Sequence, residues 1–111
     1  NVARNSEIMD AFDDLLVWFE KNGYYDEYKT ELERLALEHV YIAASVRVLR
    51  IDRKSHLLGE FSDYMDNNFP GFMSNPRLES LTSSQKLVLK LLRGKKYGLI
   101  AAMFRIKGSL G

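Results

Sequence analysis

The sequence lacks cysteine, and its 111 residues include only two histidines and two prolines. Without cysteine the chain forms no disulfide and offers no thiol nucleophile. A zinc site needs several Cys or His ligands at short spacing, and the isolated His39 and His56 do not provide them. The longest stretch without Asp, Glu, Lys or Arg is ten residues, 67–76, whereas a transmembrane helix needs about 20 apolar residues. These absences exclude a disulfide-stabilised fold and argue against zinc-binding and membrane-spanning classes.

Catalytic signatures are also missing. There is no Gly-x-Ser-x-Gly elbow, Walker-type phosphate loop, Gly-x-Gly-x-x-Gly turn or Asp-x-Asp pair. Asp10, Asp13 and Asp14 are candidate metal or acid–base carboxylates by spacing. However, they lie beside Glu7 and opposite an apolar stripe, which favours a solvated surface near a helix N-terminus. We therefore predict no catalytic residue and no metal ligand in this chain.

Charge is distributed unevenly along the chain. Residues 1–79 contain nine Lys/Arg against fifteen Asp/Glu, a net charge of −6, whereas residues 80–111 contain seven Lys/Arg and no acid, a net charge of +7. This asymmetry suggests an anionic partner for the basic segment. The alternative is that the basic segment packs beside the acidic helices of its own domain.

Apolar periodicity predicts the helices. With 46% apolar and 28% charged residues, the chain has the composition of a single globular domain. The first segment ends at Lys21 and Asn22-Gly23, a helix stop signal, and begins after Asn5 or Ser6 as the cap. Its apolar stripe consists of Ile8, Met9, Phe12, Leu15, Leu16 and Phe19.

The second segment, 25–49, shows an alternating three- and four-residue spacing of apolar positions. This spacing predicts a seam that packs against another helix, either within the domain or in a second copy. The seam residues are Tyr28, Leu32, Leu35, His39, Ile42 and Val46, with Tyr25 and Leu49 at its ends. His39 on this seam is expected to be a hydrogen-bonded core histidine.

Three further segments complete the predicted fold. A helix over 55–69 places Leu57, Leu58, Phe61 and Met65 inward after a cap at Asp52 or Ser55, and a loop follows in which Phe69, Phe72 and Met73 anchor to the core. Thr82 and Gln85 form a predicted capping box at the start of the next helix. Gly94 and Gly98 then interrupt the pattern. The fold class is all-α, a compact helical bundle of four to six helices without significant sheet, in one domain over 1–111.

The basic segment "KLVLKLLRGKKYGLIAAMFRIKG" runs from 86 to 108. Its second half carries an apolar face of Leu99, Ile100, Met103 and Phe104 flanked by cations, which suits an anionic membrane surface. The competing interpretation is that this face is the last part of the core. The candidate contact residues are Arg93, Lys95, Lys96, Tyr97, Arg105 and Lys107. Nucleic acid is disfavoured, because no helix-turn-helix pattern is present and the first 79 residues are acidic.

The run "FDDLLVWFEKNGYYDEYKTELERLALEHV" resembles the helical C-terminal region of bacterial family 2 glycosyltransferases. The matching positions are Asp14-Leu15, Trp18-Phe19, Gly23, Tyr25, Tyr28, Leu32 and Leu35-Ala36-Leu37. The later stretch "NP…SLTSSQKLVLKLLRGKKYGLI" is similar to the closing part of that region. The resemblance covers about residues 10–105.

The resemblance implies a parent enzyme that transfers a sugar from a nucleotide-sugar donor in cell-surface polysaccharide synthesis. The sequence starts with Asn, and we expect a C-terminal fragment, an accessory domain without the catalytic domain, so that nucleotide-sugar and divalent metal belong only to the missing part. Expected partners are that catalytic domain and an anionic membrane surface or lipid-linked acceptor. The expected location is cytoplasmic, peripheral at the inner face of the membrane. The alternatives are a dimerisation module, which would make the chain a homo-oligomer, and a nucleic-acid-binding domain.

Overall fold

The structure, a computed structural model, describes residues 6–110, with side chains placed over 6–106. Its α-helices are α1 (Glu7–Lys21), α2 (Tyr25–Ala36), α3 (Ala44–Leu49), α4 (Leu57–Asn68), α5 (Ser83–Arg93) and α6 (Tyr97–Leu110). A π-helix, Leu37–Ala43, joins α2 to α3 without a break, and two short 3₁₀ turns, Phe72–Ser74 and Pro76–Ser80, lie between α4 and α5. Because the described residues contain no strand, the all-α prediction is confirmed.

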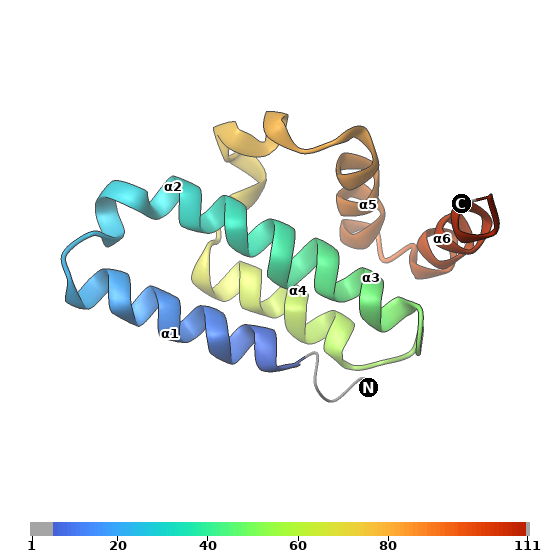
Figure 1. The fold of residues 1–111 in the computed structure, drawn as a ribbon, viewed down its shortest axis with the longest axis horizontal. Helices are drawn as coiled ribbons and strands as arrows, with labels where there is room; N and C mark the ends of the chain where they lie inside the picture. The colour runs from blue at the N-terminus through green and yellow to red at the C-terminus, as the bar shows by residue number, and fades with distance from the viewer. Residues whose placement is uncertain (1–5, 111) are drawn as a thin grey trace.

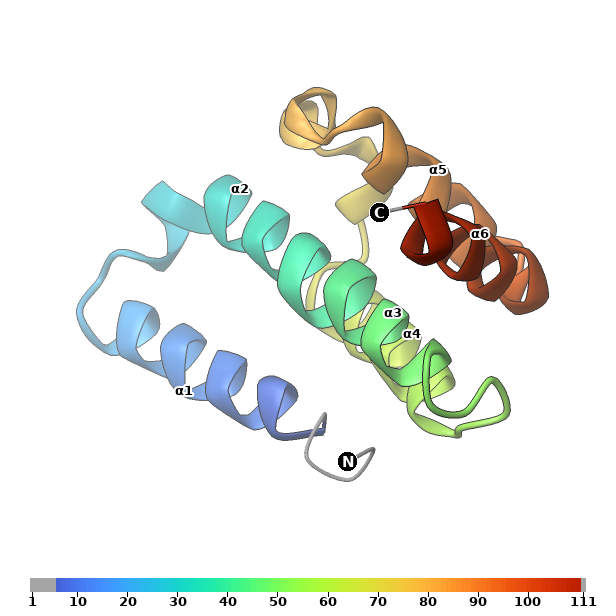
Figure 2. The ribbon, with the colours of Figure 1, turned by 45° about the vertical axis from the view of Figure 1, so that its right-hand side comes forward.

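The continuous helix from α2 through the π-helix to α3 forms the centre of the molecule (Figure 1). α1 and α4 pack against it on one side, and α5 and α6 pack against it on the other. Figures 1 and 2 both place the α1–α2 turn at one end of the long axis and α6 at the other. The molecule extends 46 Å along that axis. Its two ends therefore present different surfaces to solvent.

The π-helix changes which side chains of the central helix are buried. The buried positions follow a spacing of four: Leu32, Ala36, Val40, Ala44 and Val48 in one row, and Leu37, Tyr41, Ser45 and Leu49 in the next. In an α-helix of 3.6 residues per turn, each four-residue step would move the row by about 40° around the axis. A π-helix has wider turns with i→i+5 hydrogen bonds. The wider turns keep both rows facing the core.

The heptad seam predicted for this helix is therefore only partly buried. Leu32 and Ile42 lie in the core, and Val46 is half-buried. Tyr28 and Leu35 are 42% and 40% exposed. The predicted core position of His39 is wrong, because its side chain is 54% exposed with Nε2 3.8 Å from a carboxylate oxygen of Glu38. A 3.5-residue spacing does not describe a helix that contains a π segment.

Aromatic residues fix the α4–α5 connection to the core. Phe69 and Phe72 are buried, as expected, and each meets another ring edge-on: Phe69 meets Phe12 with 6.5 Å between centroids, and Phe72 meets Tyr41 with 6.0 Å. Met73, the third expected anchor, is 47% exposed instead. The predicted inward positions of α4, namely Leu57, Leu58, Phe61 and Met65, are all buried.

The starts of α4 and α5 follow the local sequence signals, whereas the start of α1 does not. The Thr82 hydroxyl accepts from Gln85 N–H at 3.1 Å and the Gln85 side chain accepts from Thr82 N–H at 2.9 Å, which confirms the capping box. At the start of α4, Ser55 Oγ accepts from Leu57 N–H at 3.2 Å, whereas Asp52 Oδ1 accepts from Lys54 N–H within the preceding loop. Ser6 stands at the N-cap of α1 without a side-chain capping bond.

Two helices end in Schellman motifs with different residues at the left-handed position. After α1, Gly23 has φ +75°, and its neighbour Tyr24 donates its N–H to Phe19 C=O at 2.9 Å. After α5, Lys95 has φ +57°, and Lys96 N–H donates to Leu91 C=O at 2.8 Å. Gly94 stands one residue too early to occupy the left-handed position, where glycine carries no steric penalty.

Candidate functional site

The inner side of α6 belongs to the core of the domain. Ile100 is fully buried, and Tyr97, Met103 and Phe104 are half-buried against the core. Burial, and secondarily the nearby Tyr41, raises the pKa of Tyr97 above its ordinary value. Of the two interpretations of Leu99, Ile100, Met103 and Phe104, this burial supports the one in which the face completes the core. Only Leu99 of that set points to solvent.

The segment that leads into α6 and the outer side of α6 carry different side chains, which we call the outer strip: the exposed Lys95 and Lys96 immediately before the helix, and Leu99 and Ile106 on it. Leu99 and Ile106 are seven residues apart, so they share one side of the helix. They are 57% and 62% exposed, and with Ile51 they are the most exposed large apolar side chains of the described residues. Lys95 and Lys96 form no ion pair within residues 6–106. The outer strip thus combines exposed apolar groups with unpaired cations.

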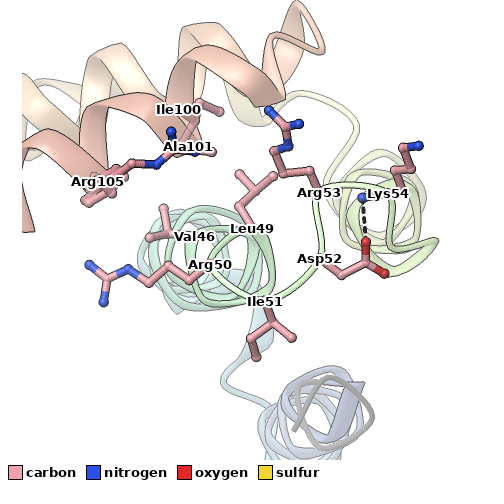
Figure 3. A pocket seen from close by; sticks show the side chains of 11 residues that line it. Val46, Leu49, Arg50, Ile51, Asp52, Arg53, Lys54, Ile100, Ala101 and Arg105 are labelled. Atoms are coloured by element: carbon pink, nitrogen blue, oxygen red, sulfur yellow. Dashed lines mark hydrogen bonds between the residues drawn. The ribbon is translucent and has the colours of Figure 1, made fainter.

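A groove opens between the inner side of α6 and the α3–α4 connection (Figure 3). It has a volume of about 640 Å³ and an apolar floor of Leu49, Ile100 and Phe104. Four cations line it: Arg50, Arg53, Lys54 and Arg105. We call this site the basic groove.

The cations of the basic groove are held by ring and helix contacts. Arg50 lies over the Phe104 ring, with Cζ 5.4 Å from the centroid. Arg53 reaches toward α6, and its Nη1 lies 3.6 Å from where a Cβ at Gly98 would stand. The groove also contains one carboxylate, Asp52, whose Oδ1 accepts from the Lys54 backbone N–H at 2.9 Å. Cations outnumber the carboxylate four to one, which makes the groove suitable for an anionic group.

The six contact residues predicted in the basic segment do not form one site. Lys95 and Lys96 lie on the outer strip, Arg105 lines the groove, and Tyr97 packs against the core. Arg93 lies apart from these residues, with Nη1 3.3 Å from Ser62 Oγ and 3.5 Å from Asp66 Oδ1, and with Cζ over the Phe72 ring. The side chain of Lys107 lies outside the described residues.

Sequence reasoning missed the contribution of the end of α3 and the connection that follows it. Residues 47–54, "RVLRIDRK", carry four Lys/Arg and one Asp. Their charge was hidden because they belong to residues 1–79, which carry a net negative charge. A count over short windows would have revealed a second basic segment.

The opposite end of the molecule carries a cluster of four aromatic rings around the α1–α2 turn. Trp18 stacks on Tyr24 with 6.2 Å between centroids, Tyr24 meets Tyr28 at 6.3 Å, and Tyr28 meets Phe19 at 5.9 Å. Trp18, Tyr24 and Tyr28 are 53%, 46% and 42% exposed. We call these four residues the aromatic cluster. Rings of this size are seldom left in contact with water in such a group unless they bind something.

The described residues contain no group of three or more His, Asp or Glu side chains placed to hold a metal ion. Within the same range, no helix is both long enough and apolar enough to cross a membrane. The outer strip and the basic groove lie at one end of the molecule, and the aromatic cluster lies at the other. Comparison with protein-family models, curated proteins and solved structures finds no match to this chain.

Proposed function

We propose that this chain is a non-catalytic helical accessory domain that contacts an anionic membrane surface through the outer strip of α6. The parent protein is the glycosyltransferase that the sequence resembles, acting in cell-surface polysaccharide synthesis at the cytoplasmic face of the membrane. The observation that carries the membrane contact is the exposure of Leu99 and Ile106 on one side of α6, with the exposed Lys95 and Lys96 immediately before that helix. The parent enzyme class rests on the sequence resemblance alone.

The physical basis is interfacial binding. Anionic headgroups attract each nearby Lys or Arg by about 1 kcal/mol, and this attraction decays within a Debye length. Leu99 and Ile106 would enter the boundary between headgroups and acyl chains, while Ile100 on the inner side stays in the core. Two apolar side chains and a few cations give weak, reversible binding. A domain tethered to a larger enzyme needs no more than that to orient it at a surface.

Co-sedimentation with vesicles tests the proposal. The domain should sediment with vesicles of phosphatidylcholine that contain about 30% phosphatidylserine, which imitates an anionic leaflet. It should not sediment with vesicles of pure phosphatidylcholine. The variant Lys95→Glu/Lys96→Glu should lose this binding. Leu99→Ser should weaken it with little effect on folding, because the side chain is 57% exposed.

A matched control is available on α5. Lys86→Glu/Lys90→Glu changes the net charge by the same amount on a neighbouring helix outside the outer strip. This variant should retain most of the vesicle binding. Equal loss in both variants, or no binding by the intact domain, would rule out the outer strip as the contact surface.

A further inference from the structure

We propose that the aromatic cluster of one molecule docks into the basic groove of a second copy, so that copies associate head to tail. The proposal goes beyond membrane contact and uses different side chains. It follows from the complementarity of two surfaces that lie at opposite ends of the folded molecule.

The aromatic cluster has the properties of an interface anchor. Trp18 and Tyr24 flank the turn at the end of the long axis and are about half exposed. Trp and Tyr dominate the binding energy of protein interfaces because they bury large areas and lose little conformational entropy. The turn itself is held by Gly23, with Asn22 Nδ2 donating to Trp18 C=O at 2.8 Å. The rings are therefore already positioned before any partner arrives.

The basic groove has the matching shape and polarity. Its floor of Leu49, Ile100 and Phe104 would receive an aromatic ring, and its volume of about 640 Å³ leaves room for one. Arg50 and Arg53 stand on either side of Leu49 in Figure 3. Arginine stacks on aromatic faces and pairs with carboxylates. These two side chains are therefore suited to the rings of the aromatic cluster and to the carboxylates around the α1–α2 turn.

Charge selects the head-to-tail arrangement. Residues 7–38, which include the aromatic cluster, carry ten Asp/Glu and three Lys/Arg. A two-fold dimer whose axis passes through the aromatic end would place this acidic surface against itself, since residues on that axis meet their own copies. Glu20, Asp26 and Glu27 surround the turn and would instead face the cations of the groove. Arg53 and Lys54 have no carboxylate partner within residues 6–106.

The contact is heterologous, and its geometry determines the product. The two surfaces lie at opposite ends of a molecule 46 Å long, so one copy cannot satisfy both by itself. A heterologous contact forms a ring when the rotation closes and an open chain when it does not. The outer strip lies on the other side of α6 from the groove and stays accessible in either product.

Sedimentation velocity of the intact chain over a concentration series gives the first test. The weight-average mass should rise with concentration at low salt and return toward the monomer at 1 M NaCl, where charge pairs are screened. Trp18 is the only tryptophan of the chain. Its emission should shift to the blue in step with association, because the ring leaves water.

Complementation between two variants gives the decisive test. The cluster variant Trp18→Ser/Tyr24→Ser keeps the groove and contains no tryptophan, whereas the groove variant Arg50→Glu/Arg53→Glu keeps the cluster. Each alone should be a folded monomer by circular dichroism and sedimentation. An equimolar mixture should form a dimer of twice the monomer mass and stop there, with the emission of the remaining Trp18 shifted to the blue.

Controls keep the outcome specific. Leu87→Ser removes an apolar side chain on α5 that is about as exposed as Tyr24. Lys86→Glu/Lys90→Glu makes the same charge change as the groove variant. Both should associate like the unmodified chain. A chain that stays monomeric at every concentration, or variants that fail to complement each other, would overturn the proposal. Vesicle binding by the groove variant is governed by the outer strip, so the two proposals can fail independently.

Discussion

The Tyr64 hydroxyl donates a 2.7 Å hydrogen bond to Asp13 Oδ1 and thereby joins α4 to α1. Burial raises the pKa of Tyr64 well above its ordinary value, and the hydrogen bond and negative charge of Asp13 raise it further. The sequence alone placed Asp13 on a solvated acidic surface. The structure gives this carboxylate a tertiary partner, although its residue remains exposed.

We expect Tyr64→Phe to lower the free energy of unfolding by about 1.5–3 kcal/mol at neutral pH, the usual range for a hydrogen bond to a charged group. The folded state holds Tyr64 protonated, whereas the unfolded chain ionises it near pH 10. Its contribution is therefore complete below pH 10 and is lost as the pH rises above that value. Urea unfolding of both proteins between pH 7 and 11 should show their stabilities converging. A constant difference across this range would contradict the assignment.

Lys95→Gly should stabilise the domain by about 0.5–1 kcal/mol. A left-handed conformation costs a non-glycine residue about 1–2 kcal/mol, and glycine removes this cost. Part of the gain is offset because glycine loses more conformational entropy on folding. Gly23→Ala should destabilise it by about 1 kcal/mol for the same reason in reverse. Thermal unfolding of both variants measures the two effects. Opposite signs are required, and two changes of the same sign would contradict the assignment of the Schellman motifs.

Ser45→Ala should be neutral or should stabilise the domain by up to about 1 kcal/mol. The Ser45 hydroxyl is fully buried and has no hydrogen-bond partner in the described part of the chain. Its removal therefore takes away an unsatisfied polar group and adds helix propensity. The neighbouring Ala44, also fully buried, is the control, since Ala44→Ser should be destabilising. Chemical denaturation distinguishes these directions.

Thr82→Ala should lower stability by about 1 kcal/mol through loss of the N-cap of α5. Gln85→Ala removes the reciprocal bond of the same capping box. Both variants disrupt one local unit. In a double-mutant cycle, the loss of stability in the double variant should therefore be smaller than the sum of the two single losses. Strict additivity would show that the two hydrogen bonds act independently.

The features that the sequence predicted well are those determined locally. Apolar spacing indicated the helices, and the pair Thr82 and Gln85 indicated a capping box that the structure contains. Gly23 adopts the left-handed conformation expected after α1. Each of these signals depends on residues only a few positions apart, so tertiary packing has little opportunity to override it.

The features that the sequence did not predict depend on distant or collective effects. The π-helix has no glycine or proline to mark it, and it moved His39 out of the expected seam. The basic groove combines Arg50 and Arg53 with Arg105, about fifty positions later in the chain. Charge averaged over long segments could not bring these cations together. Only the packing of α6 on α3 does so.

The π-helix at Leu37–Ala43 also affects how this sequence can change in length. Each i→i+5 turn holds one residue more than an α-helical turn. Deleting one residue there can be absorbed by tightening the turn, so that α3 keeps its orientation toward α4 and α6. The same deletion in α4 would rotate the following residues by about 100° and bury polar side chains. A one-residue deletion is therefore better tolerated in this π-helix than in a regular α-helix of the same domain.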